Sequence, residues 1–409
     1  MKRNLFFMAL SAMALVTSCS NDEVTEISDS NAIKFDVTAG NITRAANVFC
    51  NNNKPNDFQV WASFDNKTYI NGDQIHNDGS AWVNQSGTRY WPETDATKKV
   101  NFFAEVGADD EFNWNNGIPK IENFTVGTVV SGQKDLLYAT KIAQAKPSDG
   151  KVVLNFRHAL SQIVFQAKNT NPNLYVEIEG VSICKVGNTG TYTYNTTTST
   201  DSNTPGHNDN ATYDNTGRGS WNNTVAGTET YAVDFTAVEI PGGVKETLTG
   251  STTEVDKVYS LTSTNDENKE FSSNALLLLP QTTTAWIPTE GTSAANSTGT
   301  YFLVKCKICN YVEEGEGDDK TINKVYLWGN ENEAKEAAIP VNLNWQEGYK
   351  YIYTFKFGEG NGGVDPEDPK PVLLPITFDI TVDDFVLANE SDVDMNGTIK
   401  SEEENNTEE

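Results

Sequence analysis

Histidine and cysteine, the side chains that most often carry acid–base, nucleophilic or metal chemistry, are few in this sequence. It has three histidines and five cysteines in 409 residues. His158 stands in the alternating run NFRHAL, where we expect a packed, hydrogen-bonded side chain instead of a ligand or a base. Cys306 and Cys309 have metal-site spacing, but residues three apart on a strand point to opposite faces, so they are not expected to share a metal. No nucleophile elbow, phosphate loop or paired-histidine motif occurs, and no pattern singles out a glycosidase pair among the carboxylates, so we predict a protein that is not an enzyme.

One stretch near the C-terminus has the spacing of a cation site. In DVDMNGTIKSEE, residues 392–403, oxygen-bearing side chains occupy the ligand positions of an EF-hand calcium loop: Asp392, Asp394, Asn396, Thr398 and Glu403. This spacing therefore indicates calcium as a cofactor. The flanking helices are missing and Lys400 stands where a ligand is usual, so a solvated acidic tail over residues 389–409 is the alternative interpretation.

The beginning of the chain has the layout of an export signal. Lys2 and Arg3 precede an apolar run that is too short to cross a bilayer. The small residues VTS come directly before Cys19, which is similar to the lipobox of bacterial lipoproteins, in which the cysteine is lipidated. We predict a lipoprotein signal peptide over residues 1–19 with Cys19 as the lipidation site; an ordinary cleaved signal is the alternative.

Composition narrows the class of protein. The formal net charge is −27, and so acidic a surface repels phosphate backbones, which argues against nucleic acid as a partner. Short alternating runs separated by Gly, Asn, Asp and Pro recur along the chain, of which YKYIYTFKF at 349–357 is typical. These runs predict an all-β protein. The segment NENEAKEAA at 330–338 is the best helix candidate, and the Thr- and Asn-rich stretch 186–227 is expected to be an exposed excursion with nothing to anchor a core.

The positions of the polar stretches suggest a division of the chain. A composition shift at KIAQAKPSDGK, residues 141–151, separates two strand-rich parts, each long enough to bury its own core. GEGNGGVDPEDPKP, residues 358–371, is expected to be a flexible linker that lets the last strand leave its own domain. The expected parts are a removable segment 20–44, an N-terminal domain 45–148, a C-terminal domain 149–388 that includes the linker 358–371 and a last strand 372–386, and the acidic tail 389–409.

Nearly the same hexapeptide occurs twice, as IKFDVT from residue 33 and as ITFDIT from residue 376. On a strand, Ile33, Phe35 and Val37 share one face. The second copy offers a close volume match on the same face: Ile376, Phe378, Ile380 and the following Val382. The two segments are therefore either alternative occupants of one groove or two ordinary half-buried strands that reuse the same residue types.

Six segments together resemble the fimbrillin family of Bacteroidales, the subunits of type V pili. They are the lipobox at Cys19, ITRAA at 42–46, VVLNFRHALSQIVFQAKN at 152–169, LLLLPQ at 276–281, IPVNLNWQEGYKYIYTF at 339–355 and ITFDITVDDF at 376–385. The resemblance implies two transthyretin-like β-sandwich domains, export as a lipoprotein to the outer membrane and cell surface, and cleavage after an arginine. It also implies that the cut removes the first strand and that a neighbour's C-terminal strand fills the groove.

Arg44 and Ala45 match the cleavage position. Arginine occurs at only five positions, so an Arg-specific protease has one target between the signal and the first domain. The expected partners are that protease, other fimbrial subunits and, before cleavage, the outer membrane through the lipid. The alternatives are an uncleaved anchor or tip adhesin of the fimbria, and a glycan-binding surface lipoprotein that uses exposed aromatic rings as sugar platforms.

Overall fold

The computed structural model describes most of the chain as β-structure around two large apolar cores and one small one. The described residues are 31–39, 55–92, 97–108, 111–115, 118–198, 216–223, 227–233, 238–241, 258–262, 275–315, 321–360, 362–368, 374 and 376–384. Within these ranges no helix is long and apolar enough to span a membrane. The all-β class predicted from the alternating runs is confirmed.

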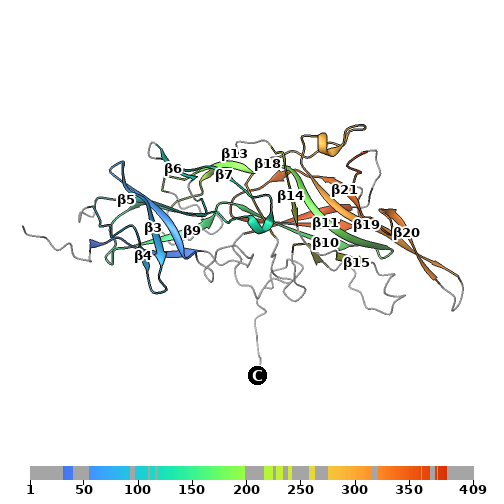
Figure 1. The fold of residues 1–409 in the computed structure, drawn as a ribbon, viewed down its shortest axis with the longest axis horizontal. Helices are drawn as coiled ribbons and strands as arrows, with labels where there is room; N and C mark the ends of the chain where they lie inside the picture. The colour runs from blue at the N-terminus through green and yellow to red at the C-terminus, as the bar shows by residue number, and fades with distance from the viewer. Residues whose placement is uncertain are drawn as a thin grey trace, which may run out of the picture.

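Seven strands close into a barrel around the first core. In barrel order they are β1 (Lys34–Ala39), β4 (Trp82–Asn84), β3 (Lys67–Asn77), β2 (Asp57–Phe64), β5 (Val100–Val106), β8 (Leu137–Gln144) and β9 (Lys151–His158). Alternate residues of each strand point inward, among them Val60, Phe102 and Leu154, each no more than 1% exposed. In Figure 1 the barrel forms the left half of the molecule.

Two facing sheets enclose the second core. One sheet contains β16 (Tyr259–Ser260), β10 (Ser161–Asn169), β23 (Tyr349–Phe357), β24 (Ile376–Asp384) and β17 (Leu276–Leu278). The other contains β14 (Glu229–Val233), β11 (Leu174–Val186), β19 (Tyr301–Glu314), β20 (Thr321–Trp328), β15 (Val238–Pro241) and β21 (Lys335–Pro340). Phe165 on β10 meets Phe302 on β19 edge to face at 5.6 Å between ring centroids, so the two sheets pack as a β-sandwich.

A smaller sheet joins the barrel to the sandwich. It consists of β13 (Ser220–Asn223), β12 (Thr189–Thr193), β7 (Ile118–Thr125) and β6 (Phe112–Asn115), while β18 (Thr282–Thr283) pairs with β22 (Leu343–Asn344) elsewhere. Tyr192 and Tyr194 are 0% and 3% exposed and pack into the sandwich core together with Tyr138 of the barrel. The expectation that residues 186–227 hold nothing to anchor a core was therefore wrong. A few tyrosines among many Thr and Asn residues are enough to fix a strand.

The predicted helix at 330–338 was also wrong, because its second half is strand β21. Ala337 and Ala338 pair with Val304 and Leu303 of β19 and are fully buried. Asn330 closes a tight turn before this strand by accepting a hydrogen bond from the Glu333 backbone N–H at 3.0 Å. Pairing with the open edge of β19 thus outweighs the helix propensity of a Glu- and Ala-rich stretch.

Candidate functional site

The first strand of the barrel, β1, is the part of the structure on which the sequence predictions converge. It runs parallel to β9 over six register pairs, from Lys34 opposite Lys151 to Ala39 opposite Phe156. On its other side only Phe35 pairs with β4, opposite Trp82. Backbone pairing therefore holds β1 mainly along one edge.

The apolar face of β1 points into the barrel as its alternation predicts. Ile33, Phe35 and Val37 are 6%, 5% and 1% exposed. Phe35 meets the rings of Phe58 and Phe102 edge to face, each at 6.0 Å between centroids. Without this strand the barrel would have an open, apolar groove between β9 and β4. A strand with a similar pattern of side chains could fill this groove.

A strap formed by residues 84–91 crosses the beginning of β1. The Ile33 N–H donates to the Arg89 carbonyl at 2.8 Å, and the Trp91 N–H donates to the Asn31 carbonyl at 2.9 Å. On the opposite side the Lys34 N–H donates to the Gly150 carbonyl at 3.0 Å. Gly150 has φ +74°, and a Cβ there would lie 2.7 Å from the Ala32 carbonyl oxygen, so only glycine fits. The strap and the Gly150 turn thus hold the residues at the start of β1 by backbone hydrogen bonds from both sides.

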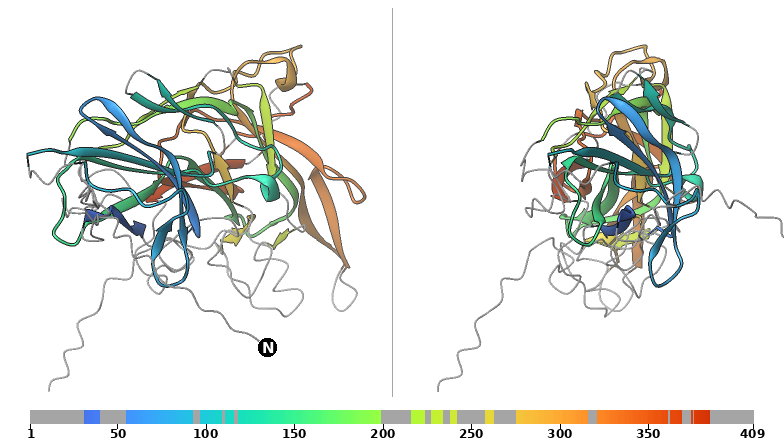
Figure 2. Two further views of the ribbon diagram at one scale, coloured as in Figure 1. Left: turned by 60° about the vertical axis from the view of Figure 1, so that its left-hand side comes forward. Right: turned by 90° about the vertical axis from the view of Figure 1, so that its left-hand side faces the viewer.

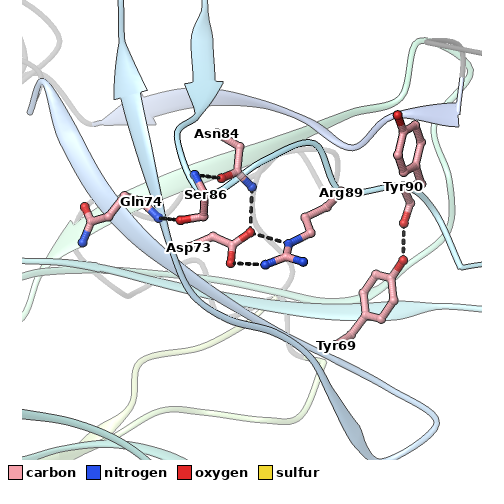
Figure 3. Close-up of polar contacts among 7 residues, drawn as sticks. All are labelled: Tyr69, Asp73, Gln74, Asn84, Ser86, Arg89 and Tyr90. Carbon is pink, nitrogen blue, oxygen red and sulfur yellow. Dashed lines mark hydrogen bonds and ion pairs between the residues drawn. The ribbon is translucent and has the colours of Figure 1, made fainter.

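Asp73 fastens the strap to β3 (Figure 3). Arg89 donates two hydrogen bonds to its carboxylate, Nε to Oδ2 at 2.6 Å and Nη2 to Oδ1 at 2.8 Å, and Asn84 Nδ2 donates to Oδ2 at 2.7 Å. Tyr69 adds a hydrogen bond from its hydroxyl to the Tyr90 carbonyl. Burial alone raises the pKa of Asp73, but the hydrogen bonds and charge of Arg89, with the Asn84 hydrogen bond, outweigh it and hold the pKa below its usual value.

We expect Asp73→Asn to loosen the strap and lower the free energy of unfolding by roughly 1–3 kcal/mol, because an amide cannot accept both charge-assisted hydrogen bonds from Arg89. Thermal melting measures the loss, and limited proteolysis at Arg44 measures the access it gives to β1. Asp65→Asn is the matched control, since its ion pair with Lys98 is long, at 3.4 Å, and exposed. Equal melting temperatures for the two variants would contradict this role for Asp73.

The second copy of the hexapeptide lies in a different part of the molecule, on β24 at the edge of the sandwich (Figure 2, dark blue for β1 and red for β24). β24 pairs antiparallel with β23 along its whole length. Ile376 is fully buried, and Phe378 contacts Phe302 at 5.6 Å between ring centroids. Ile380 and Val382 are 46% and 50% exposed. β24 is therefore anchored through its first half, whereas the apolar side chains of Ile380 and Val382 in its second half are open to solvent.

The segment before β24 does not behave as the free linker expected from its composition. Val364 exchanges two backbone hydrogen bonds with Ala338 of β21, at 2.8 and 2.9 Å, and the Ala294 N–H donates to the Pro366 carbonyl at 2.8 Å. The Gly362 N–H donates to the Ile376 carbonyl at 2.9 Å. In the described part of 358–371 the backbone is tied to the sandwich, because its glycines permit turns that bring carbonyl and amide groups against the edge of β21.

A buried polar network links the barrel to the sandwich. The Tyr138 hydroxyl on β8 donates to Glu347 Oε1 at 2.8 Å, in the turn before β23. The Arg157 guanidinium on β9 lies 4.9 Å from the Tyr138 ring centroid and donates to the Thr216 carbonyl at 3.2 Å. Burial raises the pKa of Glu347 to about 7, against the weaker opposing effects of the Tyr138 hydrogen bond and of Arg157 and Arg218.

The structure places His158, Cys306 and Cys309 on strands as the alternating pattern predicts. His158 is 4% exposed and its Nδ1 lies 2.9 Å from the Asp135 carboxylate. Cys306 belongs to the sandwich core, while Cys309 is paired in register with Tyr175 on the other face. Among the described residues no group of three or more His, Cys, Asp or Glu side chains could hold a metal.

The remaining predicted sites lie outside the described residues: Cys19, Arg44, Ala45 and the calcium ligands Asp392, Asp394, Asn396, Thr398 and Glu403. They stay predictions. Sequence reasoning missed the Asp73–Arg89 strap and the Glu347 network. The sequence contained one signal for them, the scarcity of arginine. Two of its few arginines, Arg89 and Arg157, make polar contacts inside the fold.

Comparison with known proteins decides the family. The model of a family described as fimbrillin-like matches residues 43–382. The chain belongs to the fimbrillin-like family. Its membership assigns the protein to the fimbrial adhesion subunits of the cell surface. No curated protein sequence is significantly similar to it.

Several solved structures resemble this fimbrillin-like chain over most of its length at low identity. A proposed cell adhesion protein from Bacteroides uniformis is 15% identical with a TM-score of 0.38, covering 87% of this chain and 97% of its own. Another from Parabacteroides distasonis is 9% identical with a TM-score of 0.42, covering 86% and 99%. A fimbrial protein from Bacteroides ovatus is 12% identical with a TM-score of 0.28, covering 82% of this chain and 49% of its own.

Proposed function

We propose that the protein is a structural subunit of a fimbria that is exported as a lipoprotein through Cys19, cleaved after Arg44 and polymerised by strand exchange. Cleavage releases β1 from the barrel, and the C-terminal strand of a neighbouring subunit takes its place. The function is assembly and adhesion, without catalysis.

The observation that carries the proposal is the position of β1. It precedes Arg44 in the sequence, closes the barrel with a fully apolar inner face, and has a near copy at the other end of the chain. A cut after residue 44 would separate β1 from every later strand, so only non-covalent contacts would hold it. The donor also has to leave β23, and the exposed Ile380 and Val382 contribute little to keeping it there.

Arg44→Ala is expected to abolish polymer ladders on gels of unboiled samples, because β1 would stay tethered and keep the groove filled. Arg44→Lys should fail in the same way, since it keeps the charge but removes the bond that an Arg-specific protease recognises. Mass spectrometry of the mature N-terminus is the second readout. A chain beginning at Ala45 supports cleavage, whereas a polymer whose subunits retain lipidated Cys19 contradicts it. A retained lipid without polymer favours the anchor or the glycan-binding lipoprotein.

A further inference from the structure

The described part of β1 covers only part of the groove wall formed by β9. β9, which forms one wall of the groove, runs for eight residues from Lys151 to His158. β1 pairs with the first six of them and ends at Ala39, opposite Phe156. β24 is extended over nine residues. A strand of this length can follow β9 to its end.

The repeated hexapeptide fixes how β24 would lie in the groove. When Phe378 takes the place of Phe35 opposite Val152, residues 377–384 match the eight residues of β9 one to one. Val382 then replaces Ala39 opposite Phe156, and Asp383 falls opposite Arg157. Any shift by one residue would turn the apolar face outward, so the alternation of both segments selects this register.

On the basis of the proposed function, we propose that the neighbour's β24 binds parallel to β9 in this register, and that its Asp383 pairs with Arg157 at the far end of the groove. Asp383 and Val382 would then be the residues that let the neighbour's strand displace β1 and prefer this groove.

The side chains on the inner face of β24 are larger than those of β1, which favours binding of the incoming strand. Ile380 replaces Val37, and Val382 replaces Ala39 beside Phe156, which is 2% exposed. The added methyl groups would bury further apolar surface against the barrel core. The difference lies in the two positions nearest the end of β9, where β1 has its smallest side chains.

The outer face of β9 carries a positive charge near its end, the guanidinium of Arg157. Arg157 follows Val153 and Asn155 on the face of β9 that points away from the barrel core, and it is 1% exposed. Tyr138 of β8 flanks it on one side, in register and in cation–π contact. A strand that followed β9 to its end would flank it on the other side. Gly40, the residue that follows β1 in the sequence, has no charged side chain, whereas the incoming strand brings a carboxylate next to a guanidinium that is shielded from water, where charges interact strongly.

The test compares purified polymers of the full protein carrying Asp383→Asn or Asp379→Asn with the parent. Both variants remove one carboxylate from β24, but the register places Asp379 opposite the apolar Val153, and in its own subunit Asp379 pairs with Lys356 at 3.1 Å. We expect subunits of the Asp383→Asn polymer to dissociate roughly tenfold faster in detergent, the loss typical of one charge-assisted hydrogen bond, and the Asp379→Asn polymer to match or exceed the parent. Circular dichroism of the monomers checks that both variants fold.

The outcomes separate the inference from the function on which it rests. Parental dissociation rates for Asp383→Asn, with ladders present in every sample, would overturn the Asp383–Arg157 pair and leave strand exchange standing. An equal loss in both variants would also overturn it, because the effect would then be that of charge alone. Absence of ladders from the parent itself would overturn the proposed function together with the inference.

Discussion

Replacing Ile380 by aspartate is expected to leave the subunit folded and to stop its polymerisation. In its own chain Ile380 is 46% exposed on an edge strand, so a carboxylate there stays in water. In the neighbour's groove the same position is that of Val37, which is 1% exposed. A charge buried there without a partner costs several kcal/mol or prevents insertion. Ladders on gels of unboiled samples measure polymerisation, and circular dichroism of the monomer measures whether the subunit is folded.

Val325→Asp provides the matched control for Ile380→Asp. Val325 is 49% exposed on β20, which, like β24, lies at the edge of a sheet, so the substitution makes the same chemical change at a similar exposure. It should polymerise normally. Phe378→Asp is a poorer probe, because Phe378 packs against Phe302 and Tyr353 of its own sandwich. Ladders that persist in Ile380→Asp would show that the repeated hexapeptide has no part in assembly, and the glycan-binding alternative would then be favoured.

What the sequence could predict about the site was the pattern within each strand. Alternation alone indicated that Ile33, Phe35 and Val37 share a buried face, and their exposed fractions agree. It could not show that β1 pairs with β9, because the partner of a strand depends on contacts between residues more than a hundred positions apart. Nor could it show that Ile376 is buried while Ile380 is open, since the two residues are of the same type and share one face of the strand.

The failed predictions have the same origin. The segment 330–338 has helical composition, yet the edge of β19 was available and made it a strand. The segment 358–371 has the composition of a linker, yet backbone groups of Val364 and Pro366 find partners on β21 and in the loop at Ala294. Local propensities amount to at most about 1 kcal/mol per residue for ordinary side chains, and pairing with a preformed edge exceeds them.

Glu347→Gln is expected to stabilise the protein at neutral and alkaline pH and to remove a pH dependence from its folding. Glu347 is 5% exposed, and its pKa is raised from 4.5 to about 7. The folded protein therefore keeps a proton that the unfolded chain releases as the pH rises above 4.5. The resulting stability is fully present below pH 4.5 and is lost between pH 4.5 and 7, by roughly 3 kcal/mol. A glutamine side chain has no proton to lose and still accepts the Tyr138 hydrogen bond.

Urea unfolding of the parent and the variant at pH 5 and pH 8 measures this effect as a difference, which cancels the titration of the many other carboxylates. The advantage of Glu347→Gln should be larger at pH 8 than at pH 5, and Glu331→Gln, which removes an exposed carboxylate, should show no such increase. Tyr138 belongs to the barrel and Glu347 to the sandwich, so the variant should stabilise both together. Barrel and sandwich that unfold separately, with only one shifted by the variant, would contradict a network that couples the groove to the rest of the subunit.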